Sequence, residues 1–558
     1  MEKIWLRHYP PGMPKTLDLD PEESLVDLFN ASCEEFAQLP AFTNFGHTIT
    51  YAELDDLAAR FAAHLQTATS LQRGDRVALM LPNLLQFPVA MFGILRAGFV
   101  TVNINPLYTP PELEHQLIDS GAKVIVISAN SAATLAKVIG NTDIEHVIVT
   151  EIGDLLGFPR RWIVNLIVRY IKRMVPPYQL DGAISFHQAI AADKEKFQPV
   201  SASGRDLACL QYTGGTTGRA KGAMLSHGNL IANIYQVNSV FSSRVEKGGE
   251  IMITALPLYH IYALMCNCLC YLAIGARNVL ITDPRDTAGF VNELKKWKFT
   301  AITGVNTLYQ SLVNHPRLPE VDFSHLNITS AGGMAVMEDT ARQWFKITGT
   351  DIIEGYGLSE TSPVLTSNPA DTQGFNGSIG MPLPNTDISL RNEKGKEVPQ
   401  GEPGELCARG PQVMSGYWNA PEATSRVMTK DGFFRTGDIA IMDESGYFRI
   451  VDRIKDMIIV GGFNVYPNEI EDVVTLHPDV IEAACVGVRT DQKREIVKVF
   501  VVLKPGAKTT AEGIREHCQK NLAAYKVPKL VEFRDELPKS NVGKILRRAL
   551  RDEAPDSA

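Results

Sequence analysis

The sequence predicts an α/β protein of several subdomains, built around parallel β-sheets. Short, continuous apolar runs such as Arg76–Leu81 and Lys123–Ser128 alternate with amphipathic helical patterns. Strands that are apolar throughout are buried on both faces, as in parallel sheets covered by helices. A chain of 558 residues also exceeds what one hydrophobic core supports, which favours three or four compact units of roughly 150 residues.

The first 150 residues illustrate this alternation. A helix is expected after Thr109, because a hydroxyl residue followed by Pro110 is a typical helix start, and Gly121 should end it. Lys123–Ser128 and His146–Val149 then continue the sheet. We therefore expect strands, crossover helices and further strands within one large N-terminal body.

Two changes of pattern follow towards the C-terminus. Residues 377–447 are rich in Pro and Gly between short strands, which indicates a β-rich subdomain. After Asp452–Lys455 the pattern resets to a small α/β unit, with a strand at Lys498–Leu503 and a helix from about Ala511. The predicted division is residues 1–454 and residues 455–558, with a hinge near Lys455.

Charge and cysteine content exclude several classes of protein. The chain has 55 Lys and Arg against 63 Asp and Glu, a net charge of −8, which argues against a nucleic-acid partner. Its eight cysteines show no secreted disulfide framework, and its first residues lack the apolar run of a signal peptide. We expect a cytoplasmic protein with reduced thiols.

One uncharged stretch, Ile251–Ala276, is long enough to span a bilayer. Pro257, His260 and Asn267 interrupt it, and no basic flank accompanies it. We therefore expect a buried strand, a turn and a buried helix. Its cysteines at 266, 268 and 270 are expected in the core, because their alternate spacing on a helix does not converge on one metal ion.

The strongest chemical signal is a loop rich in glycine and threonine. It follows the apolar run Leu207–Leu210 and precedes a helical pattern from about Asn229, so we expect it between a strand and a helix. Its backbone N–H groups, hydroxyls and lysine suit a triphosphate, although it lacks the Gly-Lys-Ser/Thr of a Walker A loop. The candidate residues are Tyr212, Thr213, Gly214, Gly215, Thr216, Thr217, Gly218, Arg219, Ala220, Lys221, Gly222 and Ala223.

This loop resembles the phosphate loop of the adenylate-forming (AMP-binding) superfamily, which includes acyl-CoA synthetases, luciferases and peptide-synthetase adenylation domains. Residues 431–471 are similar to bacterial long-chain fatty acid–CoA ligases in particular. Ser359 and Gly461 are mild departures, standing where many relatives have Thr and Ser. Further blocks match in order: Leu256–His260, Ser330–Met334, Glu354–Glu360, Thr436–Asp438, Val451–Asp456 and Pro538–Lys544.

The resemblance implies a two-step reaction. A fatty carboxylate attacks the α-phosphate of ATP to give acyl-AMP and pyrophosphate, and the thiol of CoA then displaces AMP. Two anions must meet in the first step, so the site needs cations and fixed donors. By resemblance, the threonines at 213, 216 and 217 hold the β- and γ-phosphates together with Lys221, while Glu360 holds Mg²⁺.

The resemblance also assigns the rest of the site. Tyr356 would lie against the purine, and Asp438 would accept from the ribose hydroxyls. Lys544 is the expected catalytic residue, bridging the acyl carboxylate and the α-phosphate, and His260 would lie beside the acyl and thioester channel. The resemblance assigns the remaining nucleotide or CoA contacts to Gly332, Gly333, Gly355, Gly357, Arg453, Lys455, Gly461 and Gly462. The candidates to line the acyl pocket are Tyr262, Val305, Thr307 and Met334.

The family implies a mobile C-terminal lid that turns at Lys455, withdrawing Lys544 and presenting the loop at Gly461 to CoA. Two rival functions stay open: a ligase for medium-chain or aryl acids or for carrier-protein loading, and a membrane lipid-binding or transport protein that uses ATP. The sequence also leaves a homodimer open.

A last segment, Arg160–Val175, has a helical pattern with a basic arc and a broad apolar face. Such a helix either packs its apolar face on the protein's own core or lies in an anionic membrane interface, as a peripheral contact with the cytoplasmic membrane. We favour packing on the core.

Overall fold

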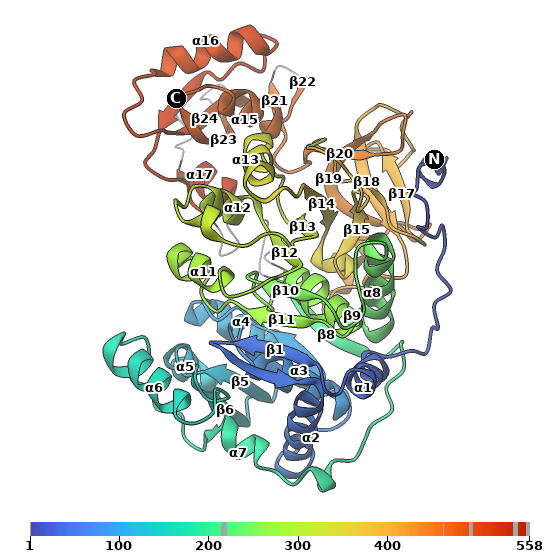
Figure 1. Cartoon of the computed structure of the whole chain (residues 1–558). Helices are drawn as coiled ribbons and strands as arrows, with labels where there is room; N and C mark the ends of the chain where they lie inside the picture. Colours follow the sequence, from blue (N-terminus) through green and yellow to red (C-terminus); the bar gives the residue numbers. More distant parts are fainter. Residues whose placement is uncertain (1, 214–219, 461–462, 490–494, 540–544, 554–558) are drawn as a thin grey trace. The chain divides into compact units, whose positions relative to one another are not determined.

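The computed structural model describes residues 2–213, 220–460, 463–489, 495–539 and 545–553 (Figure 1). The chain forms two compact units. The larger, called the body here, comprises Tyr9–Asp387 and Arg409–Thr429. The smaller, called the C-terminal unit, comprises residues 1–8, Ile388–Ala408 and 430–558.

A seven-stranded sheet forms one half of the body and is parallel except for its last pair. Two of its strands, at Arg76–Met80 and Val124–Ser128, are buried on both faces, which confirms the parallel strands expected at 76–81 and 123–128. In order across the sheet they are β7 (Ile184–Ser185), β6 (His146–Thr150), β5 (Val124–Ser128), β3 (Arg76–Met80), β4 (Val100–Asn103), β8 (Leu207–Thr213) and β9 (Lys221–Ser226).

A nine-stranded sheet forms the other half, with a parallel centre and antiparallel edges. Its order is β16 (Met381–Pro382), β15 (Val364–Ser367), β14 (Ile352–Gly357), β13 (Ile328–Ala331), β12 (Ala301–Gly304), β10 (Ile251–Thr254), β11 (Arg277–Leu280), β1 (Pro40–Asn44) and β2 (His47–Thr50). Because the central strands run in parallel, their carboxyl ends gather at one edge of the sheet, where ligands bind in open α/β sheets.

Helices cover the two sheets and separate them. The expected helix after Thr109 is confirmed as α4 (Pro110–Ser120), with a capping box at Thr109 and Gly121 in the left-handed conformation at its end. Every residue of α3 (Gln86–Arg96) is buried, and α8 (His227–Phe241) contacts strands of both sheets. The other helices of the body are α1 (Leu25–Glu35), α2 (Tyr51–Ala68), α5 (Ala132–Ala136), α6 (Arg160–Leu166), α7 (Phe186–Ile190), α9 (Ile261–Ala263), α10 (Cys270–Leu272), α11 (Thr287–Leu294), α12 (Asn306–Val313), α13 (Glu338–Thr348) and α14 (Pro421–Val427).

One buried amide joins the carboxyl edges of the two sheets. Asn83 lies just beyond β3 of the seven-stranded sheet, and its Nδ2 donates to the carbonyls of Thr254, Leu256 and Ile281 at 3.1, 2.9 and 3.2 Å. Its Oδ1 accepts from the backbone N–H of Leu258 at 2.8 Å. The acceptors all belong to the ends of β10 and β11 or to the segment after β10.

The C-terminal unit is built from separate small sheets. The β-rich subdomain expected between 377 and 447 is an antiparallel sheet of β17 (Asp387–Arg391), β18 (Gly404–Arg409), β19 (Phe434–Met442) and β20 (Phe448–Arg453). The expected small α/β unit follows, with β21 (Ile458–Val460), β22 (Phe463–Val465), β23 (Val480–Arg489), β24 (Glu495–Leu503), β25 (Leu530–Phe533), α15 (Pro467–Thr475), α16 (Ala511–Asn521) and α17 (Arg547–Glu553).

The uncharged stretch 251–276 folds as expected, as buried strand β10 followed by a helical segment from Ile261 to Leu272 that includes a π-helical turn at Leu264–Leu269. No helix in the described part of the chain is long and apolar enough to cross a membrane. Cys268 and Cys270 are buried, Cys266 nearly so, and the described residues hold no cluster of three or more potential metal-binding side chains.

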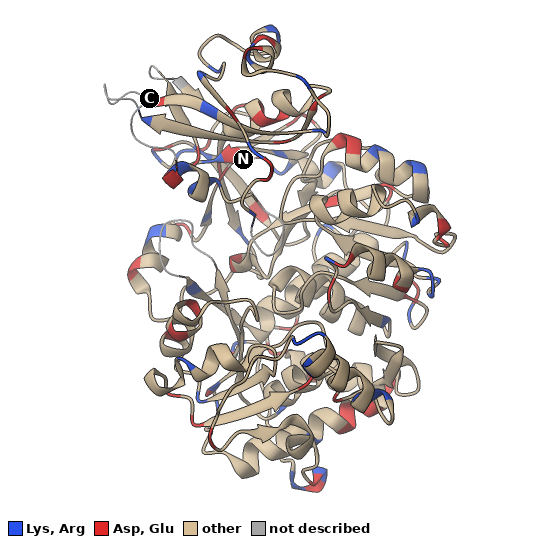
Figure 2. Ribbon diagram, turned by 90° about the vertical axis from the view of Figure 1, so that its left-hand side faces the viewer, with Lys and Arg blue, Asp and Glu red and all other residues tan. Residues whose placement is uncertain are grey.

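Charged residues of both signs are interspersed along the elements of each unit (Figure 2). The body contradicts the expected orientation of residues 160–175: the large apolar side chains of this segment are mostly exposed, and its polar side chains contact the body.

The role of Asn83 gives a first prediction. Asn83→Ala leaves the Leu258 N–H and at least two carbonyls without their partner inside the protein, so we expect a loss of about 2–4 kcal/mol in the free energy of unfolding. Denaturant unfolding measures it, with exposed Asn314→Ala as the matched control. A loss no greater than that of the control would contradict the structural role of this amide.

Candidate active site

The glycine- and threonine-rich loop connects two antiparallel strands. Its residues 214–219, which include the candidates Gly214, Gly215, Thr216, Thr217, Gly218 and Arg219, lie outside the described residues. Thr213 pairs with Lys221 and Tyr212 with Gly222, so the loop is the turn of the β8–β9 hairpin. The expectation of a strand followed directly by a helix is therefore wrong. Lys221–Ser226 is a short strand that ends at Ser226, the N-cap of α8.

Tyr212 lies beneath this hairpin. Its ring is buried, and its hydroxyl donates to the carboxylate of Asp119 at 2.5 Å. Burial, together with that carboxylate, raises the pKa of Tyr212 well above its ordinary value. Gly222 leaves room for the ring, because a Cβ there would lie only 3.0 Å from Cε2 of Tyr212. Tyr212 thus supports the hairpin and does not present its hydroxyl at the turn.

Lys221 and Glu360 meet on one aromatic ring. The Nζ of Lys221 lies 5.3 Å from the centroid of the Tyr417 ring, and the Tyr417 hydroxyl donates to Oε1 of Glu360 at 2.7 Å. Glu360 is buried in the 3₁₀ turn Ser359–Thr361, and Ala223 forms a bridge with Tyr417. Burial and the Glu360 carboxylate raise the pKa of Tyr417, so this phenol stays protonated. A cation and a carboxylate therefore stand together at the base of the hairpin turn.

The carboxyl ends of β13 and β14 bring the glycine candidates together. A Cβ on Gly332 would lie 3.3 Å from both the Gly355 carbonyl oxygen and Cζ of Tyr262. Gly333 has φ +77° and faces Val305, and Tyr356 pairs with Thr366 in the β14–β15 ladder. Gly333 is thus the exposed member of this group, whereas Tyr262 and neighbouring backbone pack closely against Gly332, Gly355 and Gly357.

At Gly357 the requirement for glycine is absolute. A Cβ there would lie 1.8 Å from the carbonyl oxygen of Pro363, a distance that no side chain tolerates. The chain can therefore turn back from β14 into the segment carrying Glu360 only because residue 357 has no side chain.

His260 follows β10 at the same edge. It is half-buried, its Nδ1 accepts from the N–H of Tyr262 at 3.3 Å, and it thereby caps α9. The neighbouring Tyr259 carbonyl accepts from Gln211 of β8 at 3.1 Å, which ties this segment to the phosphate-loop strand. Of the acyl-pocket candidates, Tyr262 and Val305 lie at the strand-end glycines.

Asp438 and Arg453 lie opposite each other in the C-terminal unit. They are paired in the β19–β20 register, and Nε of Arg453 lies 3.1 Å from Oδ1 of Asp438. Asp438 is almost fully buried, and its N–H donates to the hydroxyl of Thr436. Two residues beyond Arg453, burial and the Arg453 guanidinium lower the pKa of Lys455 to about 8. These three candidates therefore form one group.

Comparison with known proteins identifies this arrangement. Residues 29–418 match the family model described as AMP-binding enzyme, and residues 469–544 match that of the AMP-binding enzyme C-terminal domain. The chain belongs to the AMP-binding enzyme family.

Individual relatives within this family cover nearly the whole chain. The sequence is 54% identical over 555 residues to a long-chain-fatty-acid–CoA ligase of Escherichia coli O6:H1, with 99% of both chains covered. The ATP-bound crystal structure of MatB from Rhodopseudomonas palustris is 32% identical, covering 94% of this chain and 98% of that one, with a TM-score of 0.82. The anthranilate CoA ligase AuaEII, in complex with anthranoyl-AMP, is 25% identical over 96% of this chain and 98% of that one, with a TM-score of 0.84. Membership confirms the expected α/β fold.

Three further family candidates, Lys544, Gly461 and Gly462, lie outside the described residues, but the structure describes the base of the segment around Lys544. Lys539 forms a bridge with Ile545, and the N–H of Leu546 donates to the Pro538 carbonyl at 2.8 Å. The described residues on either side of 540–544 are thus held together.

Sequence reasoning missed two residues of this site. Tyr417, which contacts both Lys221 and Glu360, stands in a loop without a recognised motif. Glu354 opens the Glu-Gly-Tyr-Gly block but was not singled out. It is buried, its Oε1 accepts from the Val336 N–H at 2.9 Å, and burial raises its pKa to about 7.

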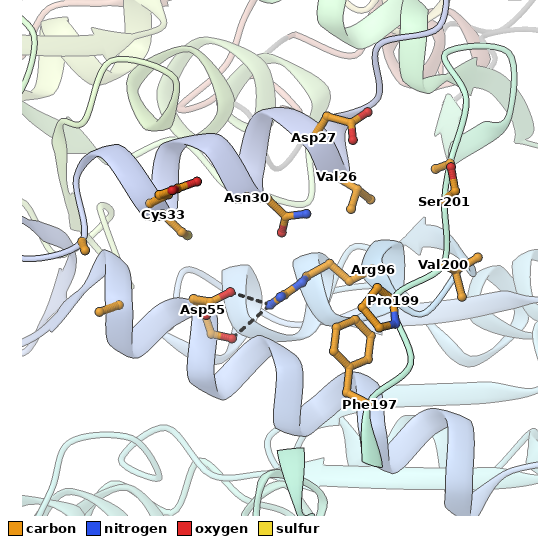
Figure 3. Close-up of a pocket in the computed structure, with 14 residues that line it drawn as sticks. Val26, Asp27, Asn30, Cys33, Asp55, Arg96, Phe197, Pro199, Val200 and Ser201 are labelled. Atoms are coloured by element: carbon orange, nitrogen blue, oxygen red, sulfur yellow. Dashed lines mark hydrogen bonds and ion pairs between the residues drawn. The ribbon is translucent and has the colours of Figure 1, made fainter. Parts of the chain in front are cut away.

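The body also holds a groove of about 680 Å³ that contains none of the candidate residues (Figure 3). Arg96 lies at its floor, with Nη1 2.9 Å from Oδ1 of Asp55. The guanidinium lies 5.3 Å from the ring centre of Phe29 and 5.0 Å from that of Phe197. Arg96 therefore anchors the linker 197–202 to the helices α1, α2 and α3.

Glu354 gives a second prediction, because its proton is retained in the folded protein up to about pH 7 but lost near pH 4.5 in the unfolded chain. A raised carboxyl pKa stabilises the folded state below pH 4.5, and this contribution is lost as pH rises through 7. Glu354→Gln resembles the protonated acid and serves as the reference. Relative to this variant, the free energy of unfolding of the wild-type protein should fall by roughly 3 kcal/mol between pH 4.5 and pH 8.

Denaturant unfolding at several pH values measures this difference. Exposed Glu34→Gln serves as the control for removing a carboxylate from the body surface. If wild type and Glu354→Gln kept a constant difference over the whole range, the buried carboxyl would not be the group that titrates.

Proposed function

We propose that the chain is an ATP- and Mg²⁺-dependent ligase that joins long-chain fatty acids to CoA through acyl-AMP, with release of AMP and pyrophosphate. The geometric observation that carries this proposal is the meeting of Lys221 and Glu360 on Tyr417, at the base of the hairpin turn. The acid is assigned by the E. coli relative, whose printed name is long-chain-fatty-acid–CoA ligase and which matches over 99% of both chains.

The phosphates of ATP are assigned to the β8–β9 hairpin and to Glu360 beside it. The described members Thr213 and Lys221 stand on either side of the turn, so a hydroxyl and an ammonium flank the same point. Glu360 offers hard carboxylate oxygen, and Mg²⁺ typically uses one or two carboxylates together with substrate phosphates. The residues present therefore fit Mg²⁺, which supplies charge neutralisation at the phosphates. Tyr417 holds the Glu360 carboxylate in place.

The adenine base of ATP is assigned to the backbone at the ends of β13 and β14. Gly333 is exposed, so a planar ring can approach the backbone at the end of β13 there, and Tyr356 offers its ring on the adjacent strand β14. Asp438 is assigned to the ribose hydroxyls, and Arg453 fixes the orientation of its carboxylate. His260, Tyr262 and Val305 are assigned to the acyl side.

Lys544 is assigned to the transfer step, in which it stabilises charge between the acyl carboxylate and the α-phosphate. The described residues that flank it, Lys539 and Ile545, form a bridge. Arg547 secures the following helix, α17: its Nε donates to Glu471 at 2.9 Å, and its Nη1 lies 3.5 Å from Oδ1 of the fully buried Asp452.

A hinge near Lys455, between residues 1–454 and 455–558, is part of the proposal. Asp452, before the hinge, accepts from the N–H of Asn468 beyond it at 2.8 Å, and Asn468 donates back to the Val451 carbonyl at 3.1 Å. Together with Arg547, these contacts form a latch across the hinge. The lid turns only when they break, and the turn then exchanges Lys544 for the Gly461–Gly462 loop at the acyl-AMP.

The question left between the rival functions is which class of carboxylic acid the enzyme uses as substrate. A ligase for medium-chain or aryl acids uses the same machinery, whereas no relative reported above supports a transport protein. Cytoplasmic location, peripheral contact with the cytoplasmic membrane and a homodimer stay predictions.

The proposal is tested by following all products at once. Purified protein with ATP, Mg²⁺, CoA and fatty acids of graded length should release AMP and pyrophosphate in equal amounts and consume CoA, with the highest kcat/KM for long chains. Orthophosphate release with CoA untouched would contradict a ligase. A preference for aryl or medium-chain acids would contradict the assigned substrate.

Lys544→Ala tests the two-position scheme. Acyl-AMP formation should fall by about 10²–10³-fold, the scale of losing one preorganised charge donor, whereas thioester formation from pre-made acyl-AMP should largely survive. Rapid-quench assays separate the two half-reactions, and exposed Arg548→Ala is the control on α17. Equal losses in both half-reactions of a folded variant would contradict the exchange of Lys544 for another loop.

A further inference from the structure

Residues 158–174 form a surface that inverts the usual amphipathic helix. The segment runs through α6 and a π-helical turn at Ile167–Ile171 along the edge of the body (Figure 1). Most of its large apolar side chains are exposed, with Phe158 at 88%, Tyr170 and Ile171 at 69% and Trp162 at 65%. Ile163, Leu166 and Met174 are also exposed.

The polar side chains hold this segment to the body. Asn165 accepts from the Gly153 N–H at 2.7 Å and donates to Asp154 at 3.1 Å. Arg169 donates through Nε to Glu151 at 2.9 Å, and Arg161 lies 3.8 Å from Asp154. The side of the helix that normally faces water is thus fixed to protein, and the apolar side is left in solvent.

Both ends of the segment are tied down as well. Arg160 donates to the carbonyl of Gly46 at 2.7 Å, in the β1–β2 turn that also carries the exposed Phe45. At the other end, Asn130 donates to the Met174 carbonyl at 3.0 Å. These contacts keep the apolar side chains facing outward, because rolling the helix inward would break all of them.

The charges bordering this apolar surface are positive. Lys172 and Arg173 are exposed and, among the described residues, make no ion pair, and Arg160 is exposed beside Phe158. A cluster of large exposed apolar side chains along one segment is typical of an interaction site. Aromatic and aliphatic side chains flanked by Lys and Arg suit the headgroup boundary of an anionic bilayer, where Trp and Tyr are enriched.

A second copy of the chain fits this surface less well. In a two-fold dimer the same patch meets itself, so two surfaces that are both bordered by Lys172 and Arg173 would be brought together. An anionic bilayer instead presents negative charge next to an apolar interior.

We propose that Phe158–Met174 docks the protein on an anionic lipid bilayer, with the apolar side chains of α6 and the following turn inserted at the headgroup level. Building on the proposed function, this contact would place the ligase on the phase into which long-chain fatty acids partition. The exposed apolar side chains show that this helix does not pack its apolar face on the protein's own core, as the sequence had led us to expect. Arg169 is not assigned to lipid binding, because it forms an ion pair with Glu151.

Vesicle sedimentation of the full chain tests the proposal, with phosphatidylcholine vesicles compared with vesicles that also contain phosphatidylglycerol. Wild type should bind the anionic vesicles more tightly. Lys172→Glu with Arg173→Glu should weaken that binding about tenfold or more, from roughly 1 kcal/mol for each basic residue near the surface. Trp162→Ser with Ile171→Ser should weaken binding to a similar degree through lost apolar burial.

The matched control is Lys298→Glu with Lys346→Glu, two exposed lysines elsewhere on the body, which should change binding less than twofold. Unchanged vesicle binding in both pairs of patch variants would overturn the proposal. So would a concentration-dependent dimer that the Trp162→Ser/Ile171→Ser pair abolishes, since that result would assign the surface to a second copy.

Ligase activity is measured separately, on fatty acid in detergent solution without vesicles, where the patch variants should match wild type. Failure of CoA consumption in wild type would contradict the proposed function and leave the vesicle result standing. Normal consumption with no vesicle binding would overturn the docking surface alone.

Discussion

The candidate site depends on a single buried amide that joins two sheets at their carboxyl edges. Asn83 uses both its donor hydrogens and its acceptor oxygen on backbone groups at or beyond the ends of β10 and β11. Those groups lead directly into the segment that carries His260. Because backbone polar groups at a buried strand end must be satisfied, the seven-stranded sheet fixes where the chain leaves the nine-stranded sheet. The phosphate-loop strand β8 is then tied to the same segment through Gln211.

The site is accordingly made of backbone more than of side chains. At the ends of β13 and β14, glycines let main-chain segments pack closely together, and Gly357 permits a reversal that any other residue would block. The charged groups, Lys221 and Glu360, come from outside these strands and are brought together by one phenol, Tyr417. Strand ends thus provide the shape, and Lys221 at the start of β9 and Glu360 in a 3₁₀ turn provide the charge.

Much of this could be predicted from the sequence where local chemistry decides the structure. Apolar strands, the Thr109 cap with Gly121 and the buried stretch 251–276 each follow from residues close together in the chain. The motifs identified the family because seven different blocks occur along the chain in the same order as in the family. What the sequence could not supply were contacts made between distant residues.

The hairpin at the phosphate loop, Tyr417 and the orientation of α6 are examples. Lys221–Ser226 is too short a strand for its pattern to separate it from the start of the next helix. Tyr417 gains its importance only from neighbours far away in the chain. The helical pattern at 160–175 correctly divides polar from apolar side chains, but which side faces the body depends on Gly153 and Glu151. Periodicity carries no information on that choice.

The buried cysteines have a consequence for redox chemistry. Burial raises the pKa of Cys33, Cys209, Cys266, Cys268 and Cys407 to about 12 and that of Cys518 to about 11, and it raises those of Cys270 and Cys485 as well. With a pKa near 12, only about one thiol in 10⁵ is ionised at pH 7. Thiol–disulfide exchange requires the thiolate. The chain's own thiols are therefore weak nucleophiles at neutral pH and should react slowly with a disulfide such as oxidised CoA.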